Sequence, residues 1–524
     1  MAEEKHSPEL SEQRDPATME AAAHVSLYDS DEDLLGQQNV DIVLNKKMHL
    51  VNNLTTAIPK AIDEIGWTGY HSKLFVLNGF GYAVDSLVLL LQGVISTPAY
   101  TEFGEVGYSG GLTIAVYVGM LVGAIFWGFG ADVIGRRTAF NVSLFICSVA
   151  TIVCGAAPNW PVLGFFIAVL GFGAGGNLVL DTAVFLEYLP GNKQWLLTGL
   201  AAWWGIGQTV TGSIAWGFLV PERYNCKTVA TCTYDNNMGW RYVMYTAGAL
   251  VLAMSLARIT VVRLKETPKY LLGMREEAAL VENLQALAAK YNRPCSLTLE
   301  QLEACGTIRS SGKAKRFSFR ETSQHISGLF ATKKLALSTS MVWMSWTLIG
   351  LVYPLFYVFL NKYLASRGVG AANQFNVWRD YTLTNISGIF GPILAGYMCN
   401  LRVLGRRYTM LIGAILTMVF FFAYTTVSTP DQNVAFSCTI GFCLNIYYGT
   451  LYAYTPEVLP SAHRGTGNGI AVACNRIMGI ISAVVGTTAD TSTSVPIYIC
   501  AALFGAMGVV AALFPFEPYG KRSS

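Results

Sequence analysis

The sequence predicts an all-α membrane protein with about twelve transmembrane helices arranged in two six-helix halves. Of its 524 residues, 52% are hydrophobic and 13% are charged, and the mean hydropathy is +0.41, whereas a soluble domain carries about 25% charged residues. From Leu74 onward the apolar runs are each roughly 20 residues long, which lets a helix cross the hydrocarbon core of a bilayer. Two short motifs recur at a single spacing, and this indicates two parallel halves.

The repeat is visible in two unrelated stretches. GFGADVIGRR, at Gly128–Arg137, lies between two apolar runs, and its core returns in LGRRYT, where Gly405 follows Gly135 by 270 residues. EYLP, which begins at Glu187, returns as EVLP at Glu457 with the same offset of 270 residues. Because both motifs recur at the same spacing, the sequence favours a duplicated unit over a chance repeat of short motifs.

The chain divides into five segments. Residues 1–72 are polar and acidic, and we expect a disordered cytosolic tail that ends in an amphipathic lead-in, Ala61–Phe75, lying on the membrane surface. A cytosolic linker at 263–334 joins the halves at 73–262 and 335–516, and a short cytosolic tail at 517–524 follows. Within the linker, helical spacing predicts helices over Met274–Asn292 and Ser296–Ala304. The expected spans are 74–97, 111–131, 138–157, 161–182, 196–219, 241–262, 335–360, 377–400, 408–427, 433–453, 466–487 and 494–515.

Basic residues set the orientation. They concentrate in the linker and in the loops that face the cytosol if the N-terminus is inside, so the positive-inside rule places both termini in the cytosol. The longest outer loop before the linker then holds Cys226 and Cys232 on the oxidising side. For these two residues the sequence leaves a disulfide and two free thiols as equal alternatives.

Several function classes find no support in the sequence. The net charge of +3 is small and scattered, so we expect no nucleic-acid partner. No CxxC pair or His/Cys cluster offers a metal site, and nothing suggests a cofactor or a catalytic constellation. GFGAGG, at Gly171–Gly176, satisfies the dinucleotide pattern, but it lies within an apolar run, where close helix packing explains the glycines. We therefore expect a protein that is not an enzyme.

The two halves, the long inner linker and the G-x-x-x-D-x-x-G-R-R motif at Gly128–Arg137 resemble the major facilitator superfamily. Gly171–Pro190, Asn237–Tyr242 and Tyr454–Gly469 are similar to its synaptic-vesicle-protein-like branch and to the fungal relatives of that branch. KETPKYLL, at Lys265–Leu272, also resembles the PESPRYL signature of sugar porters, but the seventh span lacks the paired glutamines of hexose carriers. The resemblance implies the twelve-helix major facilitator fold and a transporter that works by alternating access.

The charged loop motifs are candidates for the inner gate. Asp132 can pair with arginines and accept hydrogen bonds from a neighbouring helix end, and Glu187 and Glu457 could form a matching latch. Because Arg402 stands in the second copy where the first has Asp132, we expect the second copy to act mainly as a positive anchor. The alternative is that all these charges only anchor helix ends. The gating candidates are Gly128, Asp132, Gly135, Arg136, Arg137, Glu187, Arg406, Arg407, Glu457 and Arg464.

Ionisable residues inside the spans are the stronger functional signal, because a lone charge at the bilayer centre costs several kcal/mol. Asp85 and Asp181 are the candidates for proton coupling, since a buried carboxylate favours its neutral form. Arg476 is the candidate for attracting an anionic group of the substrate. The rival interpretation is a structural ion pair between aspartate and arginine.

The polar and aromatic residues of the inner spans predict a cavity for a small organic solute. The substrate-binding candidates are Asn78, Asn177, Trp204, Gln208, Tyr353, Tyr357, Tyr381, Asn385, Asn445, Tyr448, Asn475 and Arg476. We expect a monomeric, proton-coupled secondary transporter of a small organic solute, with an anion such as an organic acid as one candidate class, in the plasma membrane or in a vesicle or vacuole membrane. Efflux of a secondary metabolite or drug, sugar uptake, and a non-transporting receptor of the same fold are the alternatives.

Overall fold

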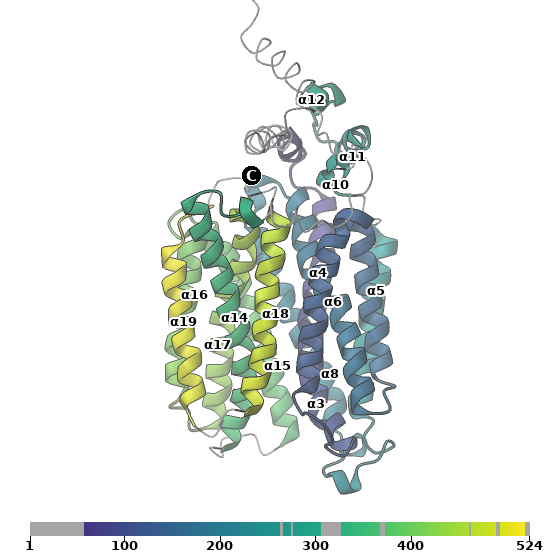
Figure 1. Cartoon of the computed structure of the whole chain (residues 1–524), viewed down its shortest axis with the longest axis vertical. Helices are drawn as coiled ribbons and strands as arrows, with labels where there is room; N and C mark the ends of the chain where they lie inside the picture. The colour runs from purple at the N-terminus through teal and green to yellow at the C-terminus, as the bar shows by residue number, and fades with distance from the viewer. Residues whose placement is uncertain are drawn as a thin grey trace, which may run out of the picture.

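The structure is a computed structural model that describes residues 57–262, 266–273, 276–304, 326–366, 373–460, 463–488 and 493–518. For 128–134, 178–179, 183, 261–262, 269, 273, 303–304, 357–366 and 487 it describes the backbone alone. Figure 1 shows two helical bundles side by side, one from each half of the chain, with the linker helices at one end.

The first bundle contains six spans. They are α3 (Gly69–Glu102), α4 (Gly111–Ile134), α5 (Arg136–Cys154), α6 (Trp160–Tyr188), α7 with α8 (Leu196–Leu200 and Ala202–Leu219) and α9 (Gly239–Ala257), which continues into a π-helical turn at Arg258–Val262. The second bundle contains α14 (Lys333–Ser366), α15 (Gln374–Cys399), α16 (Gly405–Tyr424), α17 (Pro430–Val458), α18 (Arg464–Thr488) and α19 (Val495–Leu513). Nine helices of the described ranges are long and apolar enough to cross a membrane. The helices α4, α8 and α15 occupy the remaining three places.

The 270-residue repeat extends to the starts of helices. The Asn159 side chain accepts a hydrogen bond from the Val162 N–H at the start of α6, and the Thr429 side chain does the same for the Gln432 N–H at α17. Both residues satisfy one of the free N–H groups that every helix start exposes. Gly135, which precedes α5, and Gly405, which is the first residue of α16, both have positive φ, +94° and +55°. The chain therefore enters α5 and α16 through a glycine with positive φ in both halves.

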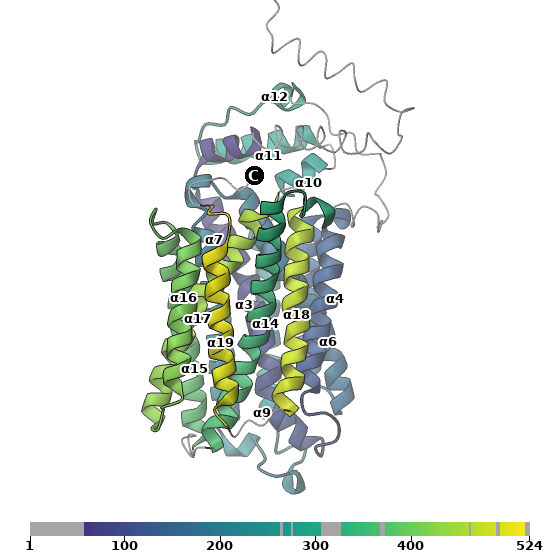
Figure 2. The same ribbon diagram turned by 60° about the vertical axis from the view of Figure 1, so that its left-hand side comes forward.

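The halves meet along two seams, α8 against α15 and α4 against α18. At the first seam a Cβ on Gly205 would lie 2.8 Å from the backbone nitrogen of Ile389, so this position of α8 lets the two backbones approach closely. Figure 2 and Figure 1 both show α18 beside α4.

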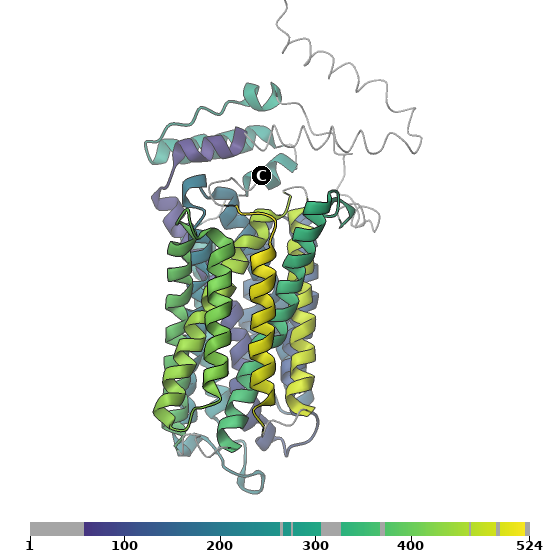
Figure 3. The same cartoon turned by 90° about the vertical axis from the view of Figure 1, so that its left-hand side faces the viewer.

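A layer of short helices covers one end of the first bundle. It contains a helix over residues 57–65, α10 (Pro268–Gly273), α11 (Glu277–Lys290) and α12 (Leu299–Ala304). These helices share a small apolar core of Ile58, Ala61, Ile62, Ile65, Leu271, Leu272, Leu280, Val281, Leu284, Ala288, Leu297 and Leu302. Figure 2 shows the helix 57–65, in purple, beside α11, and Figure 3 shows the same layer from another side.

This layer differs from the expectation of a lead-in on the membrane surface at Ala61–Phe75. The apolar face of helix 57–65 packs on the linker helices, because their own apolar faces need a partner in water and supply one for it. The helix ends before Gly66, which has φ +65°, and residues from Gly69 onward already belong to the first span, α3.

Candidate functional site

Asp85 and Arg476 form a buried ion pair between the two halves. Asp85 lies in the middle of α3 and Arg476 in the middle of α18, and their side chains are 0% and 1% exposed. Arg476 Nη2 donates to Asp85 Oδ1 at 3.0 Å and to Oδ2 at 3.4 Å, and Trp204 Nε1 donates to Oδ2 at 3.2 Å. Arg476 of the second half therefore balances the charge of the Asp85 carboxylate, and Trp204 of the first half donates to its Oδ2. This is the pairing that the sequence left open as the rival interpretation.

An aromatic cluster surrounds this pair. The Trp204 ring lies against Tyr353, Tyr448 and Tyr452, with centroid distances of 5.7, 5.0 and 6.1 Å. Tyr452 donates its hydroxyl proton to the Tyr448 oxygen at 3.1 Å, and Gln208 Nε2 donates to the Tyr353 hydroxyl. Trp204 and Gln208 come from α8, whereas the three tyrosines come from α14 and α17. The cluster therefore spans both halves and presents several polar groups beside two charges.

Asn475 joins the same region, since its Nδ2 donates to the Trp346 carbonyl at 3.4 Å and the Trp346 ring is 4.7 Å from that of Tyr452. The structure thus brings together a subset of the predicted site: Asp85, Trp204, Gln208, Tyr353, Tyr448, Asn475 and Arg476.

Other predicted residues make their described contacts elsewhere. Asn78, Asn385 and Asn445 each donate to the carbonyl four residues earlier in their own helix, and Asn177 accepts from Ser143 Oγ at 2.9 Å. Tyr381 packs edge-on against Trp378 within α15. The side chain of Tyr357 lies outside the described part of the structure. These positions remain predictions for a substrate contact.

A second buried ion pair lies within the first half. Arg258 Nη2 donates to Asp181 Oδ1 at 3.1 Å and to Oδ2 at 3.2 Å, and both side chains are 0% exposed. The same guanidinium donates to the Leu77 carbonyl at 3.0 Å and lies 3.8 Å from the centre of the Phe140 ring. Sequence reasoning missed Arg258, because an arginine near the end of an apolar run is typical of an interface anchor. The π-helical turn that begins at Arg258 marks the place where α9 departs from regular geometry.

The repeated loop motifs, Gly128–Arg137 and Gly405–Arg407, contribute one ion pair in each half. Arg136 pairs with Glu187 in the first half, and Arg406 Nη2 donates to Glu457 Oε1 at 2.7 Å in the second. A further carboxylate caps each helix that follows the loop. Glu266 accepts from the Arg137 N–H at 3.3 Å, and Glu517 accepts from the N–H groups of Arg406 and Arg407 at 3.0 Å each. A carboxylate at a helix N-terminus is favoured by the free N–H groups and the helix dipole.

The second copy of the motif is therefore more than a positive anchor. Arg406 is buried and pairs with Glu457, as Arg136 pairs with Glu187 in the first copy, and its N–H also donates to Glu517. Arg464 Nη2 donates to the Leu459 carbonyl at 3.5 Å, and Arg407 Nη2 donates to that of Ala512 at 2.6 Å. The Asp132 side chain lies outside the described part of the structure, so the part that Gly128 and Asp132 play in a gate stays a prediction.

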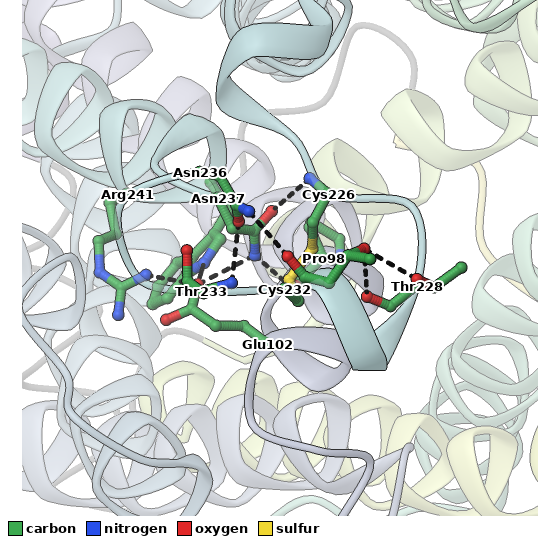
Figure 4. Close-up of a disulfide and its surroundings, with 11 residues drawn as sticks. Pro98, Glu102, Cys226, Thr228, Cys232, Thr233, Asn236, Asn237 and Arg241 are labelled. Carbon is green, nitrogen blue, oxygen red and sulfur yellow. Dashed lines mark hydrogen bonds and ion pairs between the residues drawn. A yellow bond between two sulfur atoms is a disulfide. The ribbon is translucent and has the colours of Figure 1, made fainter.

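The opposite end of the first bundle holds a disulfide and a buried carboxylate (Figure 4). Cys226 and Cys232 are bonded, with their Cα atoms 5.2 Å apart. The Cys226 N–H donates to Asn237 Oδ1 at 3.4 Å, and Asn237 Nδ2 donates to Glu102 Oε2 at 2.9 Å. Arg241 Nη1 donates to the same oxygen at 2.7 Å. The loop is thus tied to the end of α3 through Asn237.

Comparison with known proteins agrees with this architecture. The family model of the Major Facilitator Superfamily matches residues 74–483, and a second match covers 335–524. A solved structure of the proton:xylose symporter XylE bound to 6-bromo-6-deoxy-D-glucose has a similar fold, with a TM-score of 0.65, 14% sequence identity, and coverage of 86% of this chain and 97% of that one.

Two curated relatives extend the similarity to sequence. The chain is 40% identical over 504 residues to the MFS siderochrome iron transporter 1 of Ceriporiopsis subvermispora, which covers 94% of each chain. It is 27% identical over 425 residues to the niacin transporter NiaP of Acinetobacter baylyi, covering 80% of this chain and 87% of that one. The fold, the repeated loop motifs and these similarities lead to one conclusion: the chain belongs to the Major Facilitator Superfamily of membrane transporters.

Proposed function

We propose that this transporter couples the uptake of a small organic anion to a proton, with Asp85 and Arg476 as the coupling pair. The observation that carries the proposal is that this ion pair joins the two halves, α3 to α18. In alternating access the halves rock against each other, so a contact between them has to break and form again in each cycle. The Asp181–Arg258 pair lies within one half and can persist throughout the cycle.

The chemistry follows from competition for one guanidinium. A substrate carboxylate that reaches Arg476 can replace Asp85 as its partner, because arginine binds carboxylates through the same N–H groups. Asp85 then loses its counter-charge in a site of low dielectric, and it takes up a proton in place of that charge. When the substrate leaves on the other side, Arg476 recovers Asp85 and the proton is released. One anion and one proton thus move together.

The aromatic cluster supports a substrate with a flat or unsaturated body. Trp204, Tyr448 and Tyr452 offer ring faces and hydroxyl groups next to Arg476. Niacin, in the name of one relative, is an aromatic carboxylic acid, and an anion of this class fits both the rings and the arginine. The name of the other relative adds an iron-bearing siderochrome as a second candidate substrate.

The orientation that we propose has the linker helices and both termini in the cytosol. The Cys226–Cys232 disulfide is tied through Asn237 to Glu102 at the end of α3, whereas the start of α3 follows the helix 57–65 that packs on α10–α12. The disulfide and the linker helices therefore lie at opposite ends of α3, and disulfides persist on the oxidising side of a membrane. The plasma membrane and a monomeric state complete the proposal.

The test is uptake into liposomes that contain the purified protein, with labelled nicotinate as the probe and an inward proton gradient as the driving force. We expect concentrative uptake in the wild type. Asp85→Asn should lose accumulation but still exchange internal for external label, because Arg476 keeps its site while proton uptake is removed. Arg476→Ala should lose both activities, because the anion loses its charge partner.

Lys227→Ala is the matched control, since Lys227 is exposed and pairs only with the equally exposed Glu222 among its described contacts. Asp85→Asn with wild-type accumulation would refute the role of Asp85. If nicotinate is not transported, an untargeted comparison of solutes inside and outside cells, with and without the protein, identifies the substrate. No difference for any solute would favour the receptor alternative.

A further inference from the structure

The exposed loop between α11 and α12 carries a serine in an unusual position. Ser296 lies in residues 293–298, a stretch without helix or strand, and its side chain is exposed. Its N–H donates to Glu64 Oε2 at 2.7 Å, and its hydroxyl donates to Glu64 Oε1 at 2.7 Å. One serine therefore holds both oxygens of a carboxylate on the helix 57–65, which is distant in sequence.

The charge of Glu64 is well defined at neutral pH. The two hydrogen bonds from Ser296, together with the nearby Lys60, lower the pKa of the Glu64 carboxyl. The carboxylate thus stays ionised beside the serine hydroxyl, with Lys60 of its own helix as the facing cation. Any negative charge added to Ser296 Oγ would meet this carboxylate at hydrogen-bond distance.

The sequence around Ser296 matches a recognisable class of modification site. Arg293 precedes the serine by three residues, in the order Arg-Pro-Cys-Ser, and arginine-directed protein kinases bind such an arginine through acidic residues of their substrate groove. These kinases also need their substrate serine in an exposed segment without helix or strand, and residues 293–298 form such a segment, apart from the buried Leu297.

We propose that Ser296 is a phosphorylation site and that its phosphorylation releases the helix 57–65 from the linker. The kinase transfers the γ-phosphoryl group of ATP to Ser296 Oγ: the Oγ–H bond breaks, an O–P bond forms, the proton passes to the general base of the kinase, and ADP leaves. The product adds a charge of about −1.5 to −2 and removes the hydroxyl donor. Like-charge repulsion then replaces the hydrogen bond to Glu64.

The release would act on the inner face of the first half. On the same helix, Asp63 Oδ1 accepts from the N–H of Gly191 at 2.8 Å, in the loop between α6 and α7 that follows the EYLP motif. The helix also leads directly into α3, which carries Asp85. A charge on the linker would therefore loosen a contact that holds both the α6–α7 loop and the entry to the first span. The proposal rests on the cytosolic orientation proposed above, because ATP is available on that side.

The experiment uses the purified full-length protein in detergent, the catalytic subunit of cyclic-AMP-dependent protein kinase, and ATP. Mass spectrometry gives the phosphate content of Ser296, and hydrogen exchange reports on residues 57–65. We expect phosphorylation of Ser296, and exchange of residues 57–65 that becomes about tenfold faster. Arg293→Ala should slow the phosphorylation about tenfold, because the recognised charge is gone. Both faces are accessible in detergent, so this result is independent of the substrate and of the orientation.

Glu64→Gln is the matched variant for the mechanism. It keeps a hydrogen-bond acceptor for Ser296 but removes the charge, so phosphorylation should speed exchange much less than in the wild type. A synthetic peptide of residues 288–300 shows whether the kinase accepts the motif itself. An unmodified peptide or an unmodified Ser296 overturns the proposed site. Phosphorylated Ser296 with unchanged exchange, or equal release in Glu64→Gln, overturns the release by repulsion.

Discussion

Replacing Asp181 with asparagine separates a structural role for the Asp181–Arg258 pair from a role in proton coupling. The substitution removes the only negative charge within the described contacts of Arg258, whose side chain is 0% exposed. Breaking a buried ion pair by removing one partner costs about 3–5 kcal/mol. We expect the lower part of that range, because Arg258 keeps the Leu77 carbonyl at 3.0 Å and the Phe140 ring at 3.8 Å, and the amide oxygen of the new side chain can still accept a hydrogen bond.

The two single variants should differ, and the difference has a physical cause. Arg258→Met leaves a lone carboxyl group, which can become neutral by binding a proton, whereas Asp181→Asn leaves a guanidinium that cannot lose its charge. Asp181→Asn should therefore be the less stable protein. The double variant, Asp181→Asn with Arg258→Met, should recover much of the loss, since removing both charges of a buried pair is often close to neutral.

The assay is the fraction of protein that remains monodisperse in detergent after heating, followed by proton-driven uptake of the variants that stay folded. Asp181→Asn should be less stable but should still accumulate substrate under a proton gradient, because its pair lies within one half. Wild-type stability of Asp181→Asn would refute the calculated cost. The assignment of the coupling pair would be reversed by two results together: folded Asp181→Asn exchanges label without accumulating it, and Asp85→Asn still accumulates label.

Three further substitutions, the first with a matched control, test contacts elsewhere in the two bundles. Gly81→Ala would place a Cβ in steric conflict with Asp181 Oδ2 and should lower the stability of the protein by at least about 1–3 kcal/mol in the same heating assay. The control is Gly93→Ala, which should not destabilise the protein because nothing lies within 4 Å of the new Cβ. Glu457→Gln removes the counter-charge of buried Arg406, and the Cys399 carbonyl accepts a hydrogen bond from Arg406 Nη1. Loosening Arg406 should therefore speed the alkylation of the buried Cys399 thiol by a membrane-impermeant reagent. Unchanged alkylation would argue against a latch at this loop. Glu102→Gln leaves Arg241 without its carboxylate and should lower the stability of the protein by about 3 kcal/mol in the heating assay. A variant as stable as the wild type would show that the Arg241–Glu102 pair does not stabilise the end of α3.

The fold could be predicted because it depends on signals that are local or periodic. Apolar runs identify the spans, and the equal offsets of Gly405 from Gly135 and of Glu457 from Glu187 identify the duplication. Asp85 and Arg476 were recognisable for a related reason, since a charge inside an apolar run is costly without a role. An aspartate–arginine pair was one of two interpretations of the sequence, but which aspartate pairs with Arg476 was not predictable, because Asp85 and Arg476 lie in different halves and no local pattern relates them.

Arg258, Glu266 and Glu517 were missed because their roles arise only in three dimensions. Arg258 follows the apolar part of α9 and begins a π-helical turn, and the periodicity of the sequence does not predict such a turn. Glu517 follows the last span and returns to the start of α16, where its carboxylate accepts from two N–H groups. That contact, with the burial of Arg406, explains why the second copy of the motif does more than anchor the chain.

The pairing of Asp85 with Arg476 also has an electrical consequence. A carboxylate and a guanidinium in contact carry no net charge, and a protonated Asp85 beside an arginine-bound anion carries none either. Moving one elementary charge through a membrane potential of about 100 mV changes the free energy by about 2.3 kcal/mol, but neither form of the proposed cycle brings a net charge across. Accumulation should therefore follow the pH difference alone and continue unchanged when the membrane is depolarised.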